Sequence, residues 1–260
     1  MKFSIITPSY NQGKFLAECI ESVLSQSDVQ FEHIVIDAGS TDETLEVLQR
    51  YPHVKWTSGP DLGMSDGINK GFLKADGDWL MWLNCDDYLL KDALVQVRDY
   101  IQRNPNVDIV HGDCVYVTEK GVPIRRKRDT PVDEFDLLFV GCIIHSTSAF
   151  YRRKIIDSGE LLRVDYKNCM DWEYYLRLMR LNYRFGYLPL PLAGFRWHEE
   201  STTQKNWQRM IEEGLRAQRA HIEERKFPRF LGSRLALAVS RRVFQARRVL
   251  KRLVAHRCLR

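Results

Sequence analysis

The chain has 260 residues, of which 44% are hydrophobic and 28% charged, a composition typical of folded domains and unlike that of disordered or collagen-like chains. The start of the sequence lacks the features of a secretory signal peptide, and no stretch approaches the ~18 apolar residues of a membrane span, so we expect a cytoplasmic protein. The six cysteines are scattered singly, which favours reduced thiols over a disulfide framework or a zinc site.

The net charge of +5 hides an asymmetry along the chain. From Arg225 onward there are twelve Lys and Arg side chains and no Asp or Glu, whereas residues 1–224 carry 27 basic and 34 acidic side chains, a net −7. The acidic part needs a cation, or a basic partner group, before it can hold a phosphate group. The basic end suits an anionic surface.

Short apolar segments alternate with segments of helical periodicity in the first half of the chain. In chain order we predict a strand at 3–7, a helix at 15–24, a strand at 34–36, a helix opened by a capping box at 40–43, a weak strand at 54–56, a helix at 63–75, a strand at 79–83, a helix at 92–103 and a strand at 107–110. The alternation predicts an α/β fold with a mostly parallel, Rossmann-like sheet and helices on both faces. After residue 110 the rhythm loosens, which predicts a mixed α/β second half.

Polar side chains follow three of the predicted strands, at the edge where open α/β sheets bind ligands. The first strand leads into Tyr10, the second ends at Asp37, and the fourth leads into Asp86 and Asp87. Adjacent carboxylates repel one another unless a cation lies beside them. Mg²⁺ or Mn²⁺ takes one or two protein carboxylates and completes its shell with water and phosphate oxygens, so this strand end predicts a metal-bound diphosphate. The alternative is a pair of aspartates that only caps the following turn.

Four segments in this order and spacing resemble the nucleotide-binding half of the family 2 glycosyltransferases of the GT-A fold. These are SIITPSYNQGKFL, IVIDAGSTDETL, GPDLGMSDGINKGF and WLMWLNCDDYL. The resemblance continues more loosely through IIHSTSAFYRRKII and CMDWEYYLRL to about His198, and it does not cover the basic end.

The resemblance implies a site for a nucleoside-diphosphate sugar. The donor-binding residues that it implies are Pro8, Tyr10, Asp37, Asp66, Asn69 and Asp86. Ala38 stands where the family usually has an aspartate that contacts the base, so the identity of the nucleobase stays open. For Asp66 and Asn69, a role as helix-cap residues is the alternative.

The resemblance also implies a divalent ion, Mn²⁺ or Mg²⁺, at the family's DxD position. Asp86 and Asp87 match that motif, with Asn84 in place of its first aspartate. His198 lies on a loop that the resemblance places near the diphosphate, as an additional metal ligand or as a structural histidine.

A base for the acceptor hydroxyl is expected in the second half of the chain. Asp171 falls where the family carries its base, at the start of an amphipathic helix, and Glu173 is the competing candidate. A helix cap is the other interpretation of Asp171. The family inverts the anomeric configuration, which implies a single displacement and a β-linked product. His145 matches a family histidine that faces the cleft, and Trp197 and Trp207 are either core residues or platforms for a sugar.

The basic end has the pattern of an amphipathic cationic helix. Leu235, Val239 and Val243 fall on one face and Arg234 and Arg241 on the other, which predicts binding to an anionic membrane surface. A helix packed on the body is the alternative. Nucleic-acid binding is disfavoured because no recognition motif precedes the basic residues.

Together these features predict a GT-A domain at 1–204, made of a nucleotide-sugar half at 1–110 and an acceptor half at 111–204, followed by a helical basic extension at 205–260. The predicted activity is inverting, metal-dependent transfer of a sugar to a glycan or lipid-linked acceptor. A sugar nucleotidylyltransferase is the enzymatic rival, but the phosphate loop expected of it is missing after the first strand. The non-enzymatic alternative is a binding module without catalytic activity that has the same fold.

Overall fold

The computed structural model describes residues 1–198, 201, 206–226 and 251. In this part of the chain, nine strands form one sheet in the order β3-β2-β1-β4-β8-β6-β9-β5, with β7 paired to β6. The strands are β1 (Lys2–Ser9), β2 (Gln30–Asp37), β3 (Lys55–Ser58), β4 (Trp79–Trp82), β5 (Tyr88–Leu89), β6 (Ile109–Thr118), β7 (Pro123–Lys127), β8 (Ala149–Arg152) and β9 (Phe185–Trp197).

The first four strands in chain order pair in parallel, and helices cover both faces of the sheet. The helices are α1 (Gly13–Leu24), α2 (Thr44–Gln49), α3 (Met64–Lys74), α4 (Ala93–Arg103), α5 (Arg153–Asp157), α6 (Met170–Arg180) and α8 (Trp207–Glu224), with short helical segments η1 (Asp136–Val140) and η2 (Ser146–Ser148). The structure confirms the predicted α/β fold with a doubly covered sheet.

The core explains why β4 is apolar at every position. Leu80 and Trp82 pack in the cluster under α3, α5, α6 and α8, whereas Trp79, Met81 and Leu83 pack in the cluster under α1 and α4. Successive strand residues point to opposite faces, so a strand covered on both sides needs apolar residues throughout. The end of β4 is therefore fixed from both faces.

Helix α3 forms despite its glycines because one of them lets it approach the sheet. A Cβ atom at Gly71 would lie 2.3 Å from Cγ2 of Ile6 in β1, a distance that no packed side chain tolerates. The predicted helix at 63–75 is thus confirmed, and its glycine content reflects close packing.

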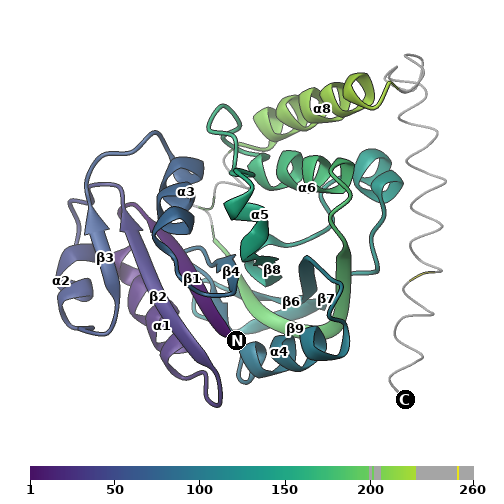
Figure 1. Cartoon of the computed structure of the whole chain (residues 1–260). Helices are drawn as coiled ribbons and strands as arrows, with labels where there is room; N and C mark the ends of the chain where they lie inside the picture. The colour runs from purple at the N-terminus through teal and green to yellow at the C-terminus, as the bar shows by residue number, and fades with distance from the viewer. Residues whose placement is uncertain (199–200, 202–205, 227–250, 252–260) are drawn as a thin grey trace.

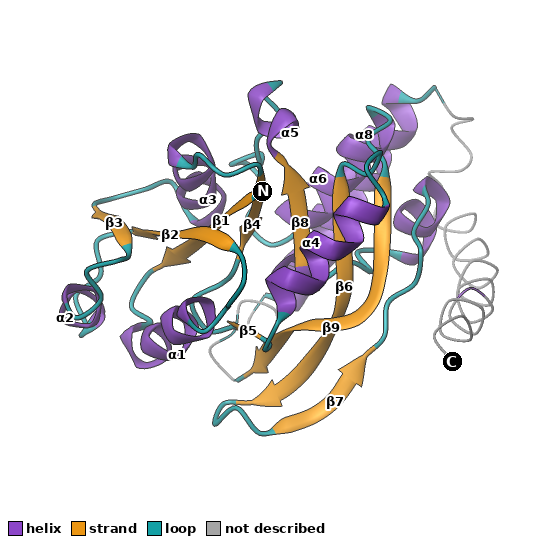
Figure 2. Cartoon of the chain, turned by 60° about the horizontal axis from the view of Figure 1, so that its bottom comes forward, coloured by secondary structure: helices purple, strands orange, loops and turns teal. Residues whose placement is uncertain are grey.

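The second half of the sheet is mixed, as predicted. Strand β8 runs antiparallel to β4 and β6, whereas the long strands β6 and β9 are parallel to each other. Figure 2 shows β6, β7 and β9 curving together away from the parallel half. Tyr116 of β6 is in register with Arg125 of β7 and with Phe195 of β9.

The predicted capping box before α2 does not form. The Ser40 hydroxyl donates to Asp37, and the backbone N–H of Ser40 donates to Asp37 Oδ2 over 3.0 Å. Asp42 instead accepts from the N–H of Thr44 at 3.1 Å and from the N–H of Gly13 at 2.9 Å. The helix starts at Thr44, later than the sequence pattern suggests, because Ser40 is hydrogen-bonded to Asp37 at the end of β2.

Helix α8 falls inside the predicted extension yet packs with the body. Its Ala217 and Ile222 belong to the same apolar cluster as α6. Gly214 lies so close to Trp172 that a Cβ atom would come within 2.2 Å of that ring, and the Glu213 carboxylate accepts from the backbone N–H groups of residues 167–169. Figure 1 shows α8 beside α6. The first helix of the predicted extension at 205–260 therefore packs on the body.

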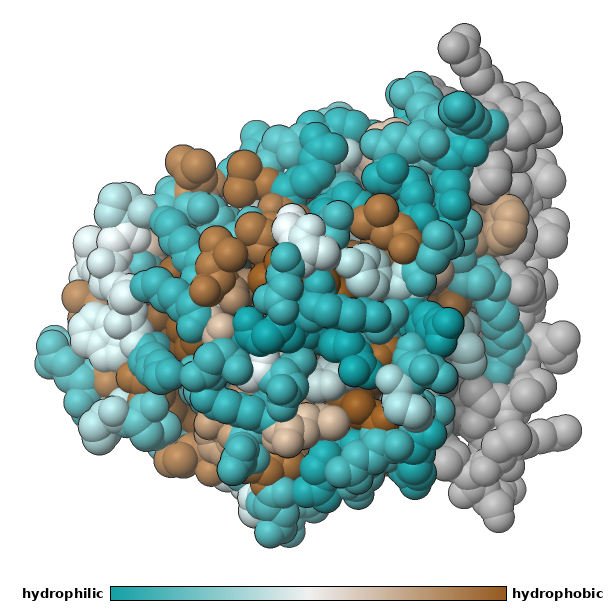
Figure 3. All heavy atoms as spheres, viewed as in Figure 1, coloured by the Kyte–Doolittle hydropathy of each residue, from teal (hydrophilic) through white to brown (hydrophobic). Residues whose placement is uncertain are grey.

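The surface of the protein and the character of its described helices match the composition of a folded domain. On the face drawn in Figure 3, apolar side chains form small separate patches within a mainly hydrophilic surface. Across the described ranges, every helix falls short of the length and apolar character needed to cross a membrane.

His33 in β2 makes the stability of the fold pH-dependent. Its ring is buried, its Nε2 lies 2.9 Å from Oγ1 of Thr7, and burial lowers its pKa from 6.5 to about 3. The unfolded chain binds a proton here below pH 6.5 and the folded chain does not until about pH 3, so the free energy of unfolding falls as the pH drops through this window. We expect this group to remove about 2 kcal/mol between pH 7.5 and pH 5.

Urea unfolding of the wild type and of a His33→Gln variant at both pH values checks this expectation. The variant should lose less stability on acidification, by the same ~2 kcal/mol. The exposed Lys91 provides the control, since Lys91→Gln leaves every histidine in place and should respond to pH like the wild type. An equal pH response in all three proteins would contradict the role of His33.

Candidate active site

The ends of β1 and β2 lie side by side at one edge of the sheet. Ser9 is in register with Asp37, and Asp37 is buried. Its carboxylate accepts from the N–H of Gly39 at 3.1 Å and from the N–H of Ser40, while the hydroxyl of Ser58 in β3 also donates to it. Asp37 thus holds the loop after β2 in a fixed shape.

Pro8 and Tyr10 frame this edge from β1. Pro8 lies in the strand beside Ile36, and Tyr10 follows the strand with 62% of its surface exposed. The Ser9 hydroxyl lies 3.7 Å from Sγ of Cys85, which brings the loop after β4 to the same place. The sequence-predicted residues at 8, 10 and 37 and the Asp86 loop are therefore neighbours.

The two polar residues predicted on α3 are engaged within the protein. Asn69 donates to the carbonyl of Leu162 at 2.8 Å and accepts from the N–H of Leu162 at 2.9 Å, so it clamps the loop before α6 onto α3. With its amide occupied in this way, Asn69 is not placed to contact the sugar nucleotide. Asp66 accepts from the N–H of Leu62 and pairs with Lys70 at 2.9 Å, and both contacts lower its pKa.

Asp86 and His198 meet beyond the end of β4. Nε2 of His198 lies 2.9 Å from Oδ2 of Asp86, and the imidazole packs against the ring of Phe15 with centroids 5.0 Å apart. Among the residues that the structure describes, Nδ1 of His198 and Oδ1 of Asn84 are buried without a hydrogen-bond partner. One carboxylate oxygen and one imidazole nitrogen are thus brought together from segments 112 residues apart.

Asp87 points into the protein, unlike its neighbour. It is 2% exposed, and its Oδ1 accepts from the N–H of Arg196 at 2.9 Å. Burial, with the nearby charge of Asp86, raises the pKa of Asp87 well above its usual range. This position does not support its predicted role as a metal ligand. Within the described ranges, no three His, Cys, Asp or Glu side chains form a cluster able to hold a metal.

Arg196 is a buried residue of the site that the sequence analysis missed. Its side chain donates to the carbonyl of Asp86 at 2.7 Å and pairs with Glu18, and its guanidinium lies 5.0 Å from the centre of the Phe15 ring. Arg196 thereby ties β9 to the loop that carries Asp86. The signal was a lone arginine between the aromatic residues Phe195 and Trp197, a pattern equally typical of an exposed strand position.

Asp171 lies in the first turn of α6, partly buried. Its Oδ1 accepts from the N–H of Trp172 at 2.8 Å, and its Oδ2 accepts from the thiol of Cys142 at 3.4 Å. The helix cap is Cys169, so the interpretation of Asp171 as the cap residue is wrong. Burial raises the pKa of the Asp171 carboxyl, although the two hydrogen bonds oppose this. A carboxylate of raised pKa is a stronger base than an ordinary aspartate.

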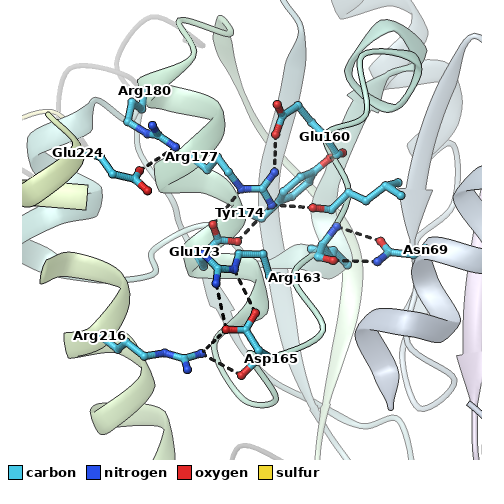
Figure 4. A network of polar contacts seen from close by, with 12 residues as sticks. Asn69, Glu160, Arg163, Asp165, Glu173, Tyr174, Arg177, Arg180, Arg216 and Glu224 are labelled. Atoms are coloured by element: carbon cyan, nitrogen blue, oxygen red, sulfur yellow. Dashed lines mark hydrogen bonds and ion pairs between the residues drawn. The ribbon is translucent and has the colours of Figure 1, made fainter. Parts of the chain in front are cut away.

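Glu173, the competing base, is occupied elsewhere. Figure 4 shows it turned toward Arg177, whose guanidinium also pairs with Glu160. The Glu173–Arg177 contact measures 2.9 Å, and Glu173 is buried. Since removing one partner of a buried ion pair is costly, Glu173 serves the packing of α6 and leaves Asp171 as the candidate base.

A short segment links Asp171 to the loop after β4. Cys142 contacts Asp171 at its start, and η2 at its end packs against β4. Thr147 in η2 lies five positions after Cys142, so these two residues lie within about 18 Å of each other. This short stretch of chain thus connects the candidate base to the strand that leads into Asp86.

His145 lies in this segment with a defined tautomer. Lys127 Nζ lies 2.9 Å from Nδ1 of His145, and Nε2 lies 2.9 Å from Oη of Tyr116. Because an ammonium group can only donate, Nδ1 accepts and the neutral ring carries its hydrogen on Nε2. Lys127 also donates to the carbonyl of Ile143 at 3.2 Å. The cationic run at 125–128 was visible in the sequence, but this use of Lys127 was not.

The chain is similar in sequence to a known family of proteins. The model of glycosyl transferase family 2 matches residues 4–159. A PGL/p-HBAD biosynthesis glycosyltransferase from Mycobacterium tuberculosis is 32% identical over 181 residues, which cover 67% of this chain and 68% of that protein.

Two solved structures share the fold. TarS 1–349 of S. aureus in complex with UDP-GlcNAc aligns with a TM-score of 0.69 at 21% identity, over 85% of this chain and 66% of that one. The mannosyltransferase PcManGT from Pyrobaculum calidifontis, in complex with GDP-Man and Mn²⁺, aligns with a TM-score of 0.63 at 18% identity, over 85% of this chain and 64% of that one.

The fold is therefore that of the GT-A glycosyltransferases, as predicted. The family match and the mycobacterial relative show that the chain belongs to glycosyl transferase family 2 and is a glycosyltransferase.

Proposed function

We propose that this glycosyltransferase moves a sugar from a nucleoside-diphosphate sugar to a hydroxyl group of a glycan or lipid-linked acceptor, in the assembly of a cell-surface polysaccharide or glycolipid. The observation that carries this proposal concerns the segment 142–147, which contacts Asp171 at its start and at its end packs against β4, the strand that leads into Asp86. The UDP-GlcNAc and GDP-Man held by the two structural neighbours support the donor class. The biosynthetic role of the mycobacterial relative supports the acceptor class.

In the proposed reaction, Asp171 takes the proton from the acceptor hydroxyl. The hydroxyl oxygen forms a bond to the anomeric carbon as the bond from that carbon to the diphosphate oxygen breaks, and the diphosphate leaves with the electron pair. Each oxygen of Asp171 accepts one hydrogen bond within the protein and keeps a lone pair for this proton. With Glu173 bound to Arg177, no second carboxylate is assigned as nucleophile, so we infer a single displacement with inversion.

The residues beyond β4 fit a divalent ion of the Mn²⁺ or Mg²⁺ type. Asp86 and His198 supply a carboxylate oxygen and an imidazole nitrogen 2.9 Å apart, and the ion would replace the hydrogen between them. With two protein ligands, the remaining positions are left for water and diphosphate oxygens. When bound, the ion stabilises the negative charge of the departing diphosphate. The Mn²⁺ in the PcManGT complex supports this assignment.

A thermal-shift screen of common sugar nucleotides, each with and without Mn²⁺, tests the proposal. A donor present at ~100 times its Kd stabilises the folded state by about 2.7 kcal/mol, which corresponds to a rise of about 5 °C or more in Tm. Release of the nucleoside diphosphate from the stabilising donor should then be measured with and without acceptor. If no sugar nucleotide shifts the Tm or is turned over, the chain is a binding module built on a transferase fold.

We also propose peripheral association with the cytoplasmic face of the cell membrane through the basic end. Most of the predicted helix lies outside the described residues. The Lys251 ammonium lies against the acidic pair Asp133 and Asp136, which favours the alternative of packing on the body at that position. Flotation with anionic liposomes should be abolished by removing residues 229–260, and unchanged flotation would refute the membrane proposal.

A further inference from the structure

A row of side chains crosses three neighbouring strands on one face of the sheet. Tyr116 of β6 pairs with Arg125 of β7 on one side and with Phe195 of β9 on the other, and directly paired residues project to the same face. Trp197 lies two positions after Phe195 and shares that face. Figure 2 shows the three strands side by side.

The aromatic members of this row form a partly open surface, which we call the aromatic platform (Tyr116, Phe195 and Trp197). The ring centroids of Tyr116 lie 5.3 Å from Phe195 and 6.1 Å from Trp197, with the planes of Tyr116 and Trp197 only 24° apart. Trp197 is 43% exposed, and the other two rings are partly buried. The exposed Trp197 ring, supported by Tyr116 and Phe195, suits the apolar face of a sugar ring.

Arg125 adds a positive charge to the platform. Its guanidinium lies 4.8 Å from the centre of the Tyr116 ring and is exposed. The next two cations of the same strand are neutralised, Arg126 by Asp113 at 2.7 Å and Lys127 by Asp129 at 3.2 Å. For Arg125, the described residues provide no acidic partner. A guanidinium stacked on a ring keeps its N–H edge free for bidentate bonds to a carboxylate or phosphate.

The platform is connected to both candidate chemical groups. At one end, Tyr116 contacts His145. His145 lies three residues after Cys142, whose thiol contacts Asp171. At the other end, Trp197 directly precedes His198, which contacts Asp86. A saccharide on the platform would therefore lie beside both the base and the donor loop, which is where an acceptor must lie.

We propose that Arg125 and the aromatic platform form an acceptor subsite selective for a saccharide that carries a negative charge, as a carboxylate or a phosphate group. The inference rests on the proposed transferase function and narrows its acceptor class. The rings bind the sugar face without regard to charge, and Arg125 selects the anion.

Binding of three probes to the full chain, in the presence of nucleoside diphosphate and Mn²⁺, tests this subsite by ligand-observed NMR titration. The probes are a disaccharide containing glucuronic acid, the methyl ester of the same disaccharide, and a short glycerol phosphate oligomer. We expect at least one anionic probe to bind. If Arg125 recognises a carboxylate, the acid should bind about five- to tenfold more tightly than its ester. Binding of the phosphate oligomer alone would show that Arg125 recognises a phosphate group.

Variants separate the roles of charge and platform. Arg125→Gln should abolish the discrimination between charged and neutral probes, Arg125→Lys should retain part of it, and Trp197→Leu should weaken all saccharide binding. Arg50→Gln, at an exposed arginine after α2, should change nothing.

Three results would overturn the subsite: equal binding of acid and ester together with no binding of the phosphate oligomer, undiminished discrimination in Arg125→Gln, or binding of anionic liposomes at Arg125 in place of any saccharide. Release of nucleoside diphosphate in the absence of acceptor keeps the two proposals apart. If the wild type shows this release and fails the probe test, only the acceptor subsite is refuted. If the release itself is missing with every sugar nucleotide, the proposed function is refuted.

Discussion

Replacing Asp171 by asparagine is expected to reduce kcat for sugar transfer about 10²- to 10⁴-fold, the usual contribution of a positioned base. The change keeps the size of the side chain and an oxygen for the N–H of Trp172, but it removes the carboxylate that we propose as the proton acceptor. KM for the sugar nucleotide should change little, because Asp171 lies in the half of the chain that we expect to bind the acceptor. Steady-state kinetics with the donor identified by thermal shift would measure both constants.

The pH dependence of the same pair of proteins makes this test specific. Burial raises the pKa of Asp171, and only the deprotonated form acts as a base. Activity of the wild type should therefore fall as the pH drops through this raised pKa, at a higher pH than for an ordinary aspartate. The residual activity of Asp171→Asn should be flat over that range.

A matched control is Asp157→Asn, at an exposed position at the end of α5. It should show the kinetic constants and the pH profile of the wild type. If Asp171→Asn kept more than about a tenth of the wild-type kcat, Asp171 could not be the base, since a base contributes at least ~10²-fold.

The parallel half of the fold could be predicted because its signals are local. Strand β4 is apolar at every position because it is buried on both faces, and the helical periodicity of 15–24 and 92–103 matches the buried faces of α1 and α4. Strand ends could be placed in the same way, which is why Asp37 and Asp86 were predicted at one edge of the sheet.

The long strands β6 and β9 were harder to predict because polar residues interrupt their apolar pattern. Asp113 is fully buried in β6, and its partners all lie outside that strand: Arg126, the backbone N–H of Asp129 and the hydroxyl of Tyr187. Arg196 in β9 is likewise 2% exposed with partners far away in sequence. A pattern that depends on pairing across the fold cannot be read from a window of neighbouring residues.

The orientation of individual site residues was beyond the sequence for the same reason. Asp86 and Asp87 are adjacent and chemically identical, yet Asp86 contacts His198 while Asp87 receives the N–H of Arg196, 109 residues later. Asn69 likewise serves a backbone segment 93 residues away. The chemistry of such residues predicts that they form hydrogen bonds, but the tertiary structure determines which partner each of them bonds to.

Asp86 carries the second large effect that we expect. Asp86→Asn keeps the shape of the side chain but removes the negative charge beside His198, so the affinity for a divalent ion and the diphosphate bound to it should fall. We expect kcat/KM for the sugar nucleotide to drop about 100-fold, equivalent to about 2.7 kcal/mol of lost stabilisation. Mn²⁺ should no longer add to the thermal shift caused by the nucleoside diphosphate.

The control for Asp86 is Asp28→Asn, at an exposed position whose backbone φ of 59° asparagine also adopts readily. This variant should keep the full response to Mn²⁺. Two further measurements bear on the metal: chelation with EDTA should reduce wild-type activity as much as the Asp86→Asn change does, and EDTA should have little further effect on that variant. Full activity of the wild type in EDTA would show that the carboxylate at the end of β4 acts without an ion, and Asp86 would then have to orient His198 or the donor directly.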